Sequence, residues 1–256
     1  MTSSRAAALF RLALVVLVWG HLAEALRPAH HLDELVRLGV TTALSLALPC
    51  VFLGFYTRSA TLVAGLCLQA LVWVWGFGAE LRLGVELQSV TTRLLANAMV
   101  LLVFLPAGRS FSIDRWRRPD DPERGWGRPR WALIAQGVLA WWGLSAMAIL
   151  PALPSLLLPI GVGGDPGSAL PMLDGSLAPV VAAMGVTLPL LVLLPRARPW
   201  ALAVATVAIG LAHVFTGLGL LGLVLLLMLA AAIPPASVHH AIDTLLSPRA
   251  PDRAST

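Results

Sequence analysis

Long apolar runs follow one another along this 256-residue chain, and they constrain its fold more than any other feature. Hydrophobic residues make up 58% of the sequence and charged residues 12%, about half the charged fraction of an ordinary soluble domain. The mean hydropathy of +0.83 points the same way. Several runs reach about 18 residues or more, long enough for a helix to cross roughly 30 Å of hydrocarbon. The sequence therefore predicts an all-α fold, a polytopic bundle of transmembrane helices.

The boundaries of these runs predict about eight spans. Residues 199–233 are about twice a span length and break around residues 216–219, so we interpret them as two spans, with one long tilted helix as the alternative. Residues 236–247 have the pattern of a short amphipathic surface helix. The other predicted spans cover residues 7–26, 36–56, 60–78, 89–107, 131–151 and 177–194.

The spans divide into two predicted halves of four, residues 1–107 and residues 131–235. A basic loop at residues 108–130 joins the halves, and residues 236–256 form the surface helix and a polar tail. The joining loop contains seven arginines, and its proline and glycine residues argue against one continuous helix.

The arginines predict the orientation, because cytoplasmic loops of membrane proteins carry an excess of basic residues. The expected outer side holds only Arg27, Arg37, Arg82 and Arg93. Both the N-terminus and the C-terminus are therefore expected on the cytoplasmic side of a multi-pass protein. A cleaved signal is the alternative for the first segment, because residues 23–25 resemble a signal-peptidase site. The expected inner arginines are Arg5, Arg58, Arg109, Arg115, Arg117, Arg118, Arg124, Arg128, Arg130, Arg196, Arg198, Arg249 and Arg253.

Polar residues inside the apolar runs are candidates for function, because they are costly in hydrocarbon. His21 and Glu24 are three residues apart at the outer end of the first span, so they share a helix face. They form either an outward-facing metal or proton site or, as we favour, a solvated helix end. His213 lies within the seventh span. It is either a buried proton donor or ligand to a quinone-like headgroup, or, as we favour, a partner in an interhelical hydrogen bond.

Three further polar residues lie inside predicted spans. Arg93 and Asn97 are four residues apart on one face of the fourth span, and Gln136 lies in the fifth. Arg93 is expected either to pair with Glu24 or to extend its guanidinium to the outer surface, and structural pairing is favoured. These residues, with His213, are the candidate intramembrane positions. The sequence assigns no catalytic residue and no metal ligand set.

Two motifs flank the third and fourth predicted spans. Residues 53–61 read Leu-Gly-Phe-Tyr-Thr-Arg-Ser-Ala-Thr, and residues 104–114 read Phe-Leu-Pro-Ala-Gly-Arg-Ser-Phe-Ser-Ile-Asp. This pair resembles the HTTM family, the membrane domain related to vitamin K-dependent γ-carboxylase. Smaller DoxX-like proteins with four spans are a rival family. The resemblance implies a bacterial cytoplasmic membrane protein.

The resemblance implies little about chemistry. The carboxylase uses a lysine base and reduced vitamin K, but all 18 basic residues here are arginine, so that catalytic apparatus cannot be carried over. Ser112 is predicted to cap a surface helix that starts near Asp114, whose charge also suits a helix N-terminus. We therefore expect the second motif to be structural.

Two functions follow as hypotheses. The first is a non-catalytic component or accessory subunit that packs with other membrane protein subunits and with lipids. The alternative is a membrane enzyme or redox protein that acts on a quinone-like lipid, with His213 and the His21/Glu24 end as its polar groups. A transporter is weaker, because no internal repeat is apparent. Nucleic acid is not expected as a partner despite a pI near 10.8, because membrane topology accounts for the arginines.

Overall fold

The computed structural model describes residues 4–25, 34–76, 83–117, 129–149, 178–216 and 219–246. Within these ranges the regular elements are all helices, which confirms the predicted all-α class. They are α1 (Ser4–Ala25), α2 (Glu34–Leu53), α3 (Thr57–Gly76), α4 (Leu83–Leu102), α5 (Ile113–Arg117), α6 (Pro129–Ile149), α8 (Ala178–Leu193), α9 (Arg198–Thr216), α10 (Gly219–Ala230) and α11 (Pro235–Leu246).

Two boundary predictions are confirmed. The run at residues 199–233 is two helices, because α9 ends at Thr216 and α10 begins at Gly219. The predicted amphipathic helix at residues 236–247 is α11, which begins one residue earlier and ends one residue earlier than expected. The polar tail after residue 246 lies outside the described residues.

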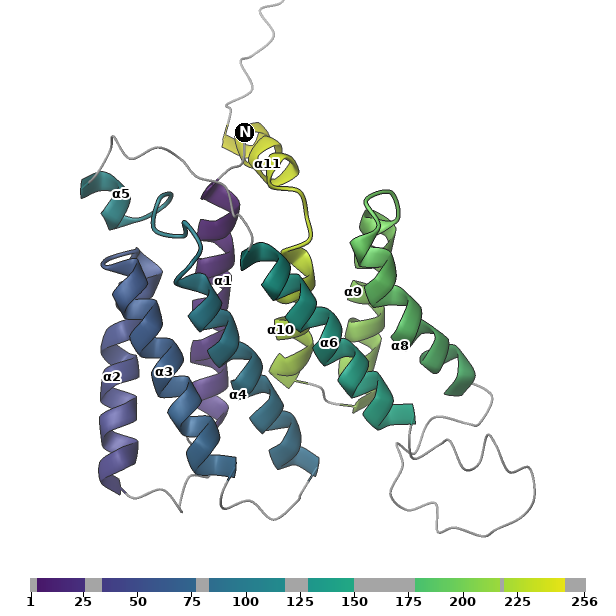
Figure 1. Ribbon diagram of the computed structural model, residues 1–256, viewed down its shortest axis with the longest axis horizontal. Coiled ribbons are helices and arrows are strands. Elements are labelled where there is room, and N and C mark those ends of the chain that lie inside the picture. Colours follow the sequence, from purple (N-terminus) through teal and green to yellow (C-terminus); the bar gives the residue numbers. More distant parts are fainter. Residues whose placement is uncertain are drawn as a thin grey trace, which may run out of the picture.

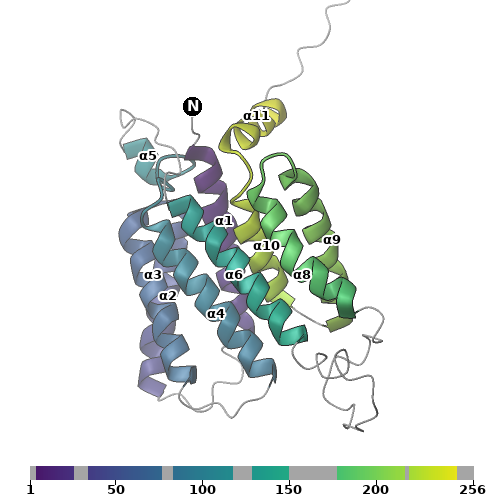
Figure 2. The same ribbon diagram turned by 45° about the vertical axis from the view of Figure 1, so that its right-hand side comes forward.

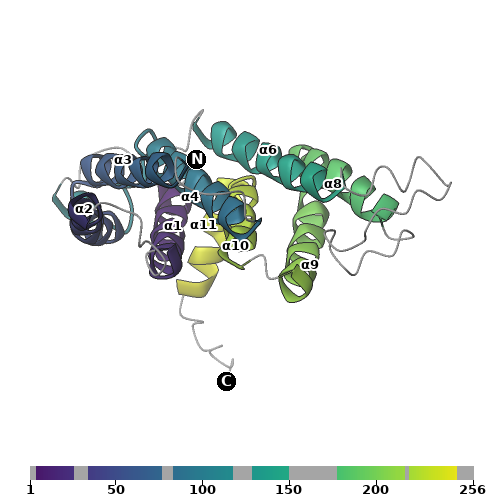
Figure 3. The same ribbon diagram turned by 90° about the horizontal axis from the view of Figure 1, so that it is seen from below.

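The long helices lie side by side and run between the same two ends of the molecule (Figure 1, Figure 2). Helices α2 and α3 form one edge, α8 and α9 form the other, and α1, α4 and α10 lie between them (Figure 3). Helix α10 packs against α1, α4, α6 and α9, and α6 packs against α4 and α8. Helices of the two predicted halves therefore pack directly on one another.

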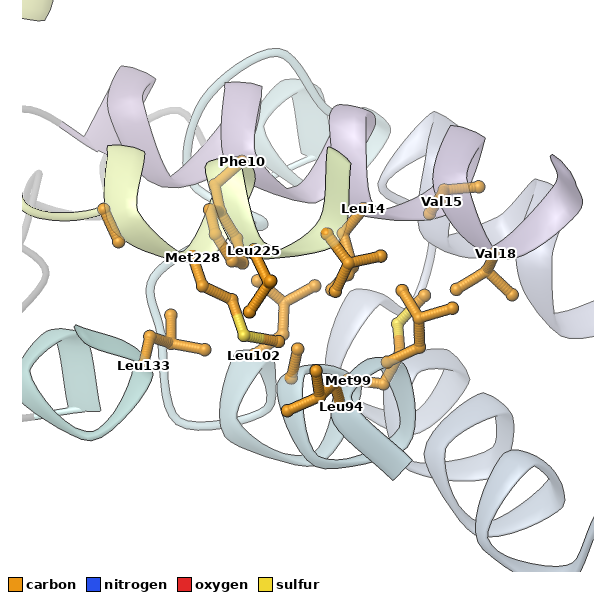
Figure 4. Close-up of a cluster of buried hydrophobic side chains, with 14 of the residues drawn as sticks. Phe10, Leu14, Val15, Val18, Leu94, Met99, Leu102, Leu133, Leu225 and Met228 are labelled. Carbon is orange, nitrogen blue, oxygen red and sulfur yellow. The ribbon is translucent and has the colours of Figure 1, made fainter. Parts of the chain in front are cut away.

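One continuous core joins the halves. In Figure 4, side chains from four helices point toward one another, and the same residues belong to a single buried cluster. The side chains in this cluster are closely packed and make many van der Waals contacts with one another. These contacts fix the relative positions of the helices. Its central members are Phe10 and Leu14 of α1, Leu94, Met99 and Leu102 of α4, Leu133 of α6, and Leu225 and Met228 of α10.

The basic segments gather at one end. The start of α1, the turn between α2 and α3, α5, the turn between α8 and α9, and α11 all lie at the end marked by the N-terminus (Figure 1). This end, called the basic end below, carries the described arginines Arg5, Arg58, Arg109, Arg115, Arg117, Arg130, Arg196 and Arg198.

Within the described residues, one helix is long and apolar enough to cross a membrane. It is α1, over Ser4–Ala23, a stretch of 20 residues. Shorter apolar segments occur in six other helices, at Leu38–Leu53, Thr57–Val72, Val90–Leu102, Ala183–Leu193, Arg198–Gly210 and Leu220–Ala230. One such helix is weak support for a membrane protein, because the core helix of a soluble protein and a signal sequence have the same composition.

Candidate functional site: an arginine-centred junction at the basic end

The turn between α2 and α3 depends on a glycine. Gly54 has φ of +70°, and its amide donates to the carbonyl of Val51 at 3.2 Å while the next amide donates to Cys50 at 2.8 Å. These bonds close the C-terminal end of α2 with a residue in the left-handed region. A Cβ on Gly54 would lie 2.2 Å from Cβ of Ser112 and 2.7 Å from Nη1 of Arg11. The turn therefore needs glycine both for its backbone and for close approach.

Asp114 joins the two sequence motifs. Its carboxylate accepts from the amides of Tyr56 and Thr57 at 3.0 and 2.9 Å and from the Thr57 hydroxyl at 2.7 Å. In return, the Asp114 amide donates to the carbonyl of Gly54 at 2.9 Å. A negative carboxylate on the first amides of α3 satisfies donors that the helix itself cannot use. Asp114 therefore caps α3, a helix 57 residues earlier in the chain.

Ser112 caps α5, as the sequence predicted. Its hydroxyl accepts from the amide of Arg115 at 3.1 Å and also donates to the carbonyl of Gly108. Helix α5 begins at the next residue, Ile113. The same loop contains Phe111, whose φ of 48° is uncommon for a residue with a side chain. Ser112 and Asp114 thus hold the loop and α5 against the start of α3.

Arg11 of α1 also holds this junction together. It is 0% exposed, and its guanidinium donates to the carbonyls of Ala107 and Phe111, both at 2.6 Å, and of Phe52 at 3.5 Å. A planar group with five donors is suited to several carbonyls at once. Arg11 therefore ties α1 to the end of α2 and to the loop after α4. Arg11 stands within an apolar run of the sequence, and nothing in that run indicates these partners.

Two further arginines close other helix ends. Arg130 donates to the carbonyls of Ala231 and Ala232 at 2.7 Å and of Ile233 at 3.1 Å, just after α10. Arg198 donates to the carbonyl of Val192 at 3.0 Å, at the end of α8. The last carbonyls of a helix have no partner within it, and a cation there also favours the helix dipole. Arginines at the basic end therefore serve packing as well as charge.

His21 lies inside the bundle at the opposite end of α1. It is 2% exposed, and its Nε2 is 2.7 Å from Oγ1 of Thr92 on α4. The predicted partner Glu24 also lies in α1, but its side chain is outside the described residues. His21 thus joins two helices instead of lying at a solvated helix end. In the part of the chain that the structure describes, no group of three His, Cys, Asp or Glu is placed to hold a metal.

The other candidate residues are distributed over α4, α6 and α9. Arg93 and Asn97 are exposed on α4. Gln136 of α6 donates to the carbonyl of Leu94 at 3.1 Å and so joins α6 to α4. His213 lies in α9, which packs against α8 and α10, and its side chain is outside the described residues. Helix α10 lies between α4 and α9 (Figure 3).

The structure has two cavities among the described residues that bear on these contacts. The first, of about 370 Å³, lies between α1 and α2 and is largely apolar, with Trp19, Leu48 and the hydroxyl residues Thr41 and Ser45 among its walls. The second, of about 330 Å³, lies at the basic end between the start of α3 and the segment that includes α5. Neither cavity is lined by Asn97 or Gln136.

Comparison with known proteins adds no relative: no family model, no curated protein and no solved structure matches this chain.

Proposed function

We propose that this chain is a multi-pass integral membrane protein of the HTTM type, with about eight spans, and that it acts as a non-catalytic component packed against another membrane protein. The membrane placement is supported by apolar side chains on the outside of the helices as well as inside. Leu46 of α2, Leu139 of α6, Val207 of α9 and Leu223 of α10 are all exposed. Helices that are apolar on every side suit a lipid environment, and soluble monomers rarely expose such extended apolar surface.

The orientation is supported by the gathering of arginines at one end. Positive charge concentrates on the cytoplasmic side of membrane proteins. The basic end also carries exposed Trp116 and Trp200, and tryptophan prefers the membrane interface. We therefore assign the basic end to the cytoplasmic side of a bacterial cytoplasmic membrane.

The HTTM relation is supported by the meeting of the two motifs. They are separated by the third and fourth helices in the chain, yet Asp114 of the second motif bonds the backbone and hydroxyl of Thr57 in the first. Gly54, also in the first motif, leaves room for Ser112 of the second. Because the two motifs bind each other in the fold, there is a physical reason for both to occur in the same chain.

The observation that carries the function is the exposed polar face of α4. Arg93 and Asn97 are one helical turn apart and both are exposed. Within the predicted span at residues 89–107, Asn97 lies eight residues, about 12 Å, from one end and ten residues, about 15 Å, from the other. On the proposed placement, Asn97 is therefore deep in the hydrocarbon.

Two exposed hydroxyl groups on other helices do not need a hydrogen-bond partner from outside the chain. Thr187 and Thr206 are exposed, but their hydroxyls donate to the carbonyls of Ala183 and Leu202, four residues back in the same helix. An asparagine carboxamide has two N–H donors and an acceptor, more than the backbone of its own helix satisfies. Polar residues in spans are costly toward lipid and commonly hydrogen-bond a neighbouring helix. We infer that a helix of a partner covers Arg93 and Asn97 and offers acceptors to both.

The test is the effect of Asn97→Leu on assembly. The full chain is extracted from its native membrane in mild detergent, and complexes are measured by size-exclusion chromatography with mass spectrometry. We expect the wild type to elute with a stoichiometric partner, either a second protein or a second copy, and Asn97→Leu to lose it. Thr206→Val is the matched control on another exposed helix and should retain the partner. Equal assembly of Asn97→Leu and wild type would contradict the proposal.

The quinone-like alternative has one observation in its favour. The cavity between α1 and α2 has a volume in the range of small-molecule sites and is mostly apolar. Its described hydroxyl groups, on Thr41 and Ser45, are weak partners for a quinone carbonyl. A stoichiometric quinone in organic extracts of the purified protein would favour this alternative.

A further inference from the structure

The cavity at the basic end combines a polar wall with several cations. Its walls include Tyr56, Arg58, Pro106, Arg109, Arg115 and Arg117. Asp114 also lines it. The four arginines and one aspartate give a formal charge of +3 on the wall.

The one negative charge among these residues, the carboxylate of Asp114, already has hydrogen-bond donors within the protein. The Asp114 carboxylate accepts three hydrogen bonds from Tyr56 and Thr57, as described above. Two of those donors are amides at the positive end of α3, so they offset the charge of the carboxylate. The described residues of the wall therefore carry more positive than negative charge.

Two of the arginines are exposed and flank the cavity. Arg58 is exposed on the first turn of α3. Arg117 is exposed at the end of α5, and its Cζ lies 4.8 Å from the ring centre of Phe55 and 5.7 Å from that of Tyr56. Contact with aromatic faces holds a guanidinium in place. Its N–H groups lie in the plane of the guanidinium and can still donate to an acceptor beside it. The cavity is thus bordered by donors suited to a phosphate group.

An apolar track continues from the cavity along α3. Arg58, Leu62 and Leu66 are spaced by four residues, so they lie on one face of the helix. Leu62 is 43% exposed and Leu66 is 57% exposed. A cationic pocket that leads into an exposed apolar stripe matches a molecule with an anionic head and hydrocarbon chains. A soluble phosphate compound would use the pocket but not the stripe.

We propose that this cavity binds the phosphate of an anionic phospholipid headgroup, with the acyl chains along Leu62 and Leu66 of α3. The inference rests on the proposed membrane placement with the basic end at the cytoplasmic interface. The bound lipid would hold the turn between α2 and α3 against α5.

The test uses the full chain in nanodiscs of phosphatidylcholine that contain a small fraction of phosphatidylglycerol. Native mass spectrometry measures how much phosphatidylglycerol each variant retains. Arg58→Gln should weaken retention about fivefold, and Arg58→Gln with Arg117→Gln about 25-fold, because each arginine near a membrane surface contributes roughly fivefold. Arg196→Gln removes the same charge from the exposed turn between α8 and α9, which does not line the cavity and lies at the opposite edge of the bundle from α3 (Figure 3). A phosphate in the cavity is screened from that charge, so this variant should change retention less than about twofold. Equal retention by Arg58→Gln and Arg196→Gln would overturn the site.

A second arm separates the lipid from a soluble ligand. Inorganic phosphate and glycerol phosphate are added to the nanodiscs, and we expect neither to displace phosphatidylglycerol at millimolar concentration. Displacement by either would overturn the lipid assignment in favour of a soluble phosphate. Failure of the membrane placement would appear differently, as wild-type chain that stays soluble without detergent. Failure of the partner proposal would appear in the assays at position 97 and would leave the retention of phosphatidylglycerol unchanged.

Discussion

Replacement of Gly54 by alanine should destabilise the chain strongly, because the added methyl group has no room. Gly54 has φ of +70°, where an L-residue with a side chain costs roughly 1–2 kcal/mol. The new Cβ would lie 2.2 Å from Cβ and 2.8 Å from Cα of Ser112, so the capping loop must shift. Overpacking of this kind costs typically about 1–3 kcal/mol. The sum is about 2–5 kcal/mol.

The assay is thermal unfolding in detergent, followed by tryptophan fluorescence, for which the chain has nine tryptophans. A loss of about 3 kcal/mol corresponds to a fall in Tm of about 10 °C for a chain of this size. Gly39→Ala is the matched control, because a Cβ on Gly39 in α2 meets no atom within 4 Å. That variant should be unchanged or more stable by up to about 1 kcal/mol, since alanine favours helix more than glycine. Equal Tm values for Gly54→Ala and Gly39→Ala would refute the reasoning.

Two other contacts give further predictions. A double-mutant cycle of His21→Leu and Thr92→Val, measured by unfolding in detergent, should give a coupling free energy of about 0.6 kcal/mol and no more than about 1.7 kcal/mol, typical of interhelical hydrogen bonds in membranes. A coupling of zero would show that this contact contributes nothing. Arg130→Met should lower the free energy of unfolding by about 1–3 kcal/mol, because it leaves the carbonyls of Ala231 and Ala232 without the arginine donor. Arg196→Met, on an exposed arginine, should stay within about 0.5 kcal/mol of wild type, and a similar loss in both variants would argue against the capping role.

The sequence predicted the elements that depend on local signals. Apolar runs located the helices, the glycine-containing break near residues 216–219 separated α9 from α10, and Ser112 was identified as the cap of α5. Each of these features is decided within a few residues of chain, by periodicity, by backbone freedom or by a side chain that reaches the next turn. The eight-span count and the HTTM relation stay predictions.

The contacts that organise the candidate site were not predictable in the same way. Arg11 bonds Ala107 and Phe111, about a hundred positions away, and Asp114 caps a helix that starts at Thr57. Nothing local distinguishes an arginine that binds distant carbonyls from one that reaches the membrane surface. His21 was likewise interpreted together with Glu24, its neighbour on the same helix face. Its partner in the structure is Thr92 on another helix. Such pairings depend on which helices pack together, which periodicity alone does not specify.

The most direct test of the account is a cross-linking measurement at Asn97 in intact membranes. A photoactivatable phenylalanine analogue replaces Asn97 in one variant and Leu223 of α10, also exposed, in a control. We expect a discrete protein adduct from position 97 and lipid adducts from position 223. Lipid adducts alone from position 97 would contradict the conclusion that a partner protein covers this face of α4.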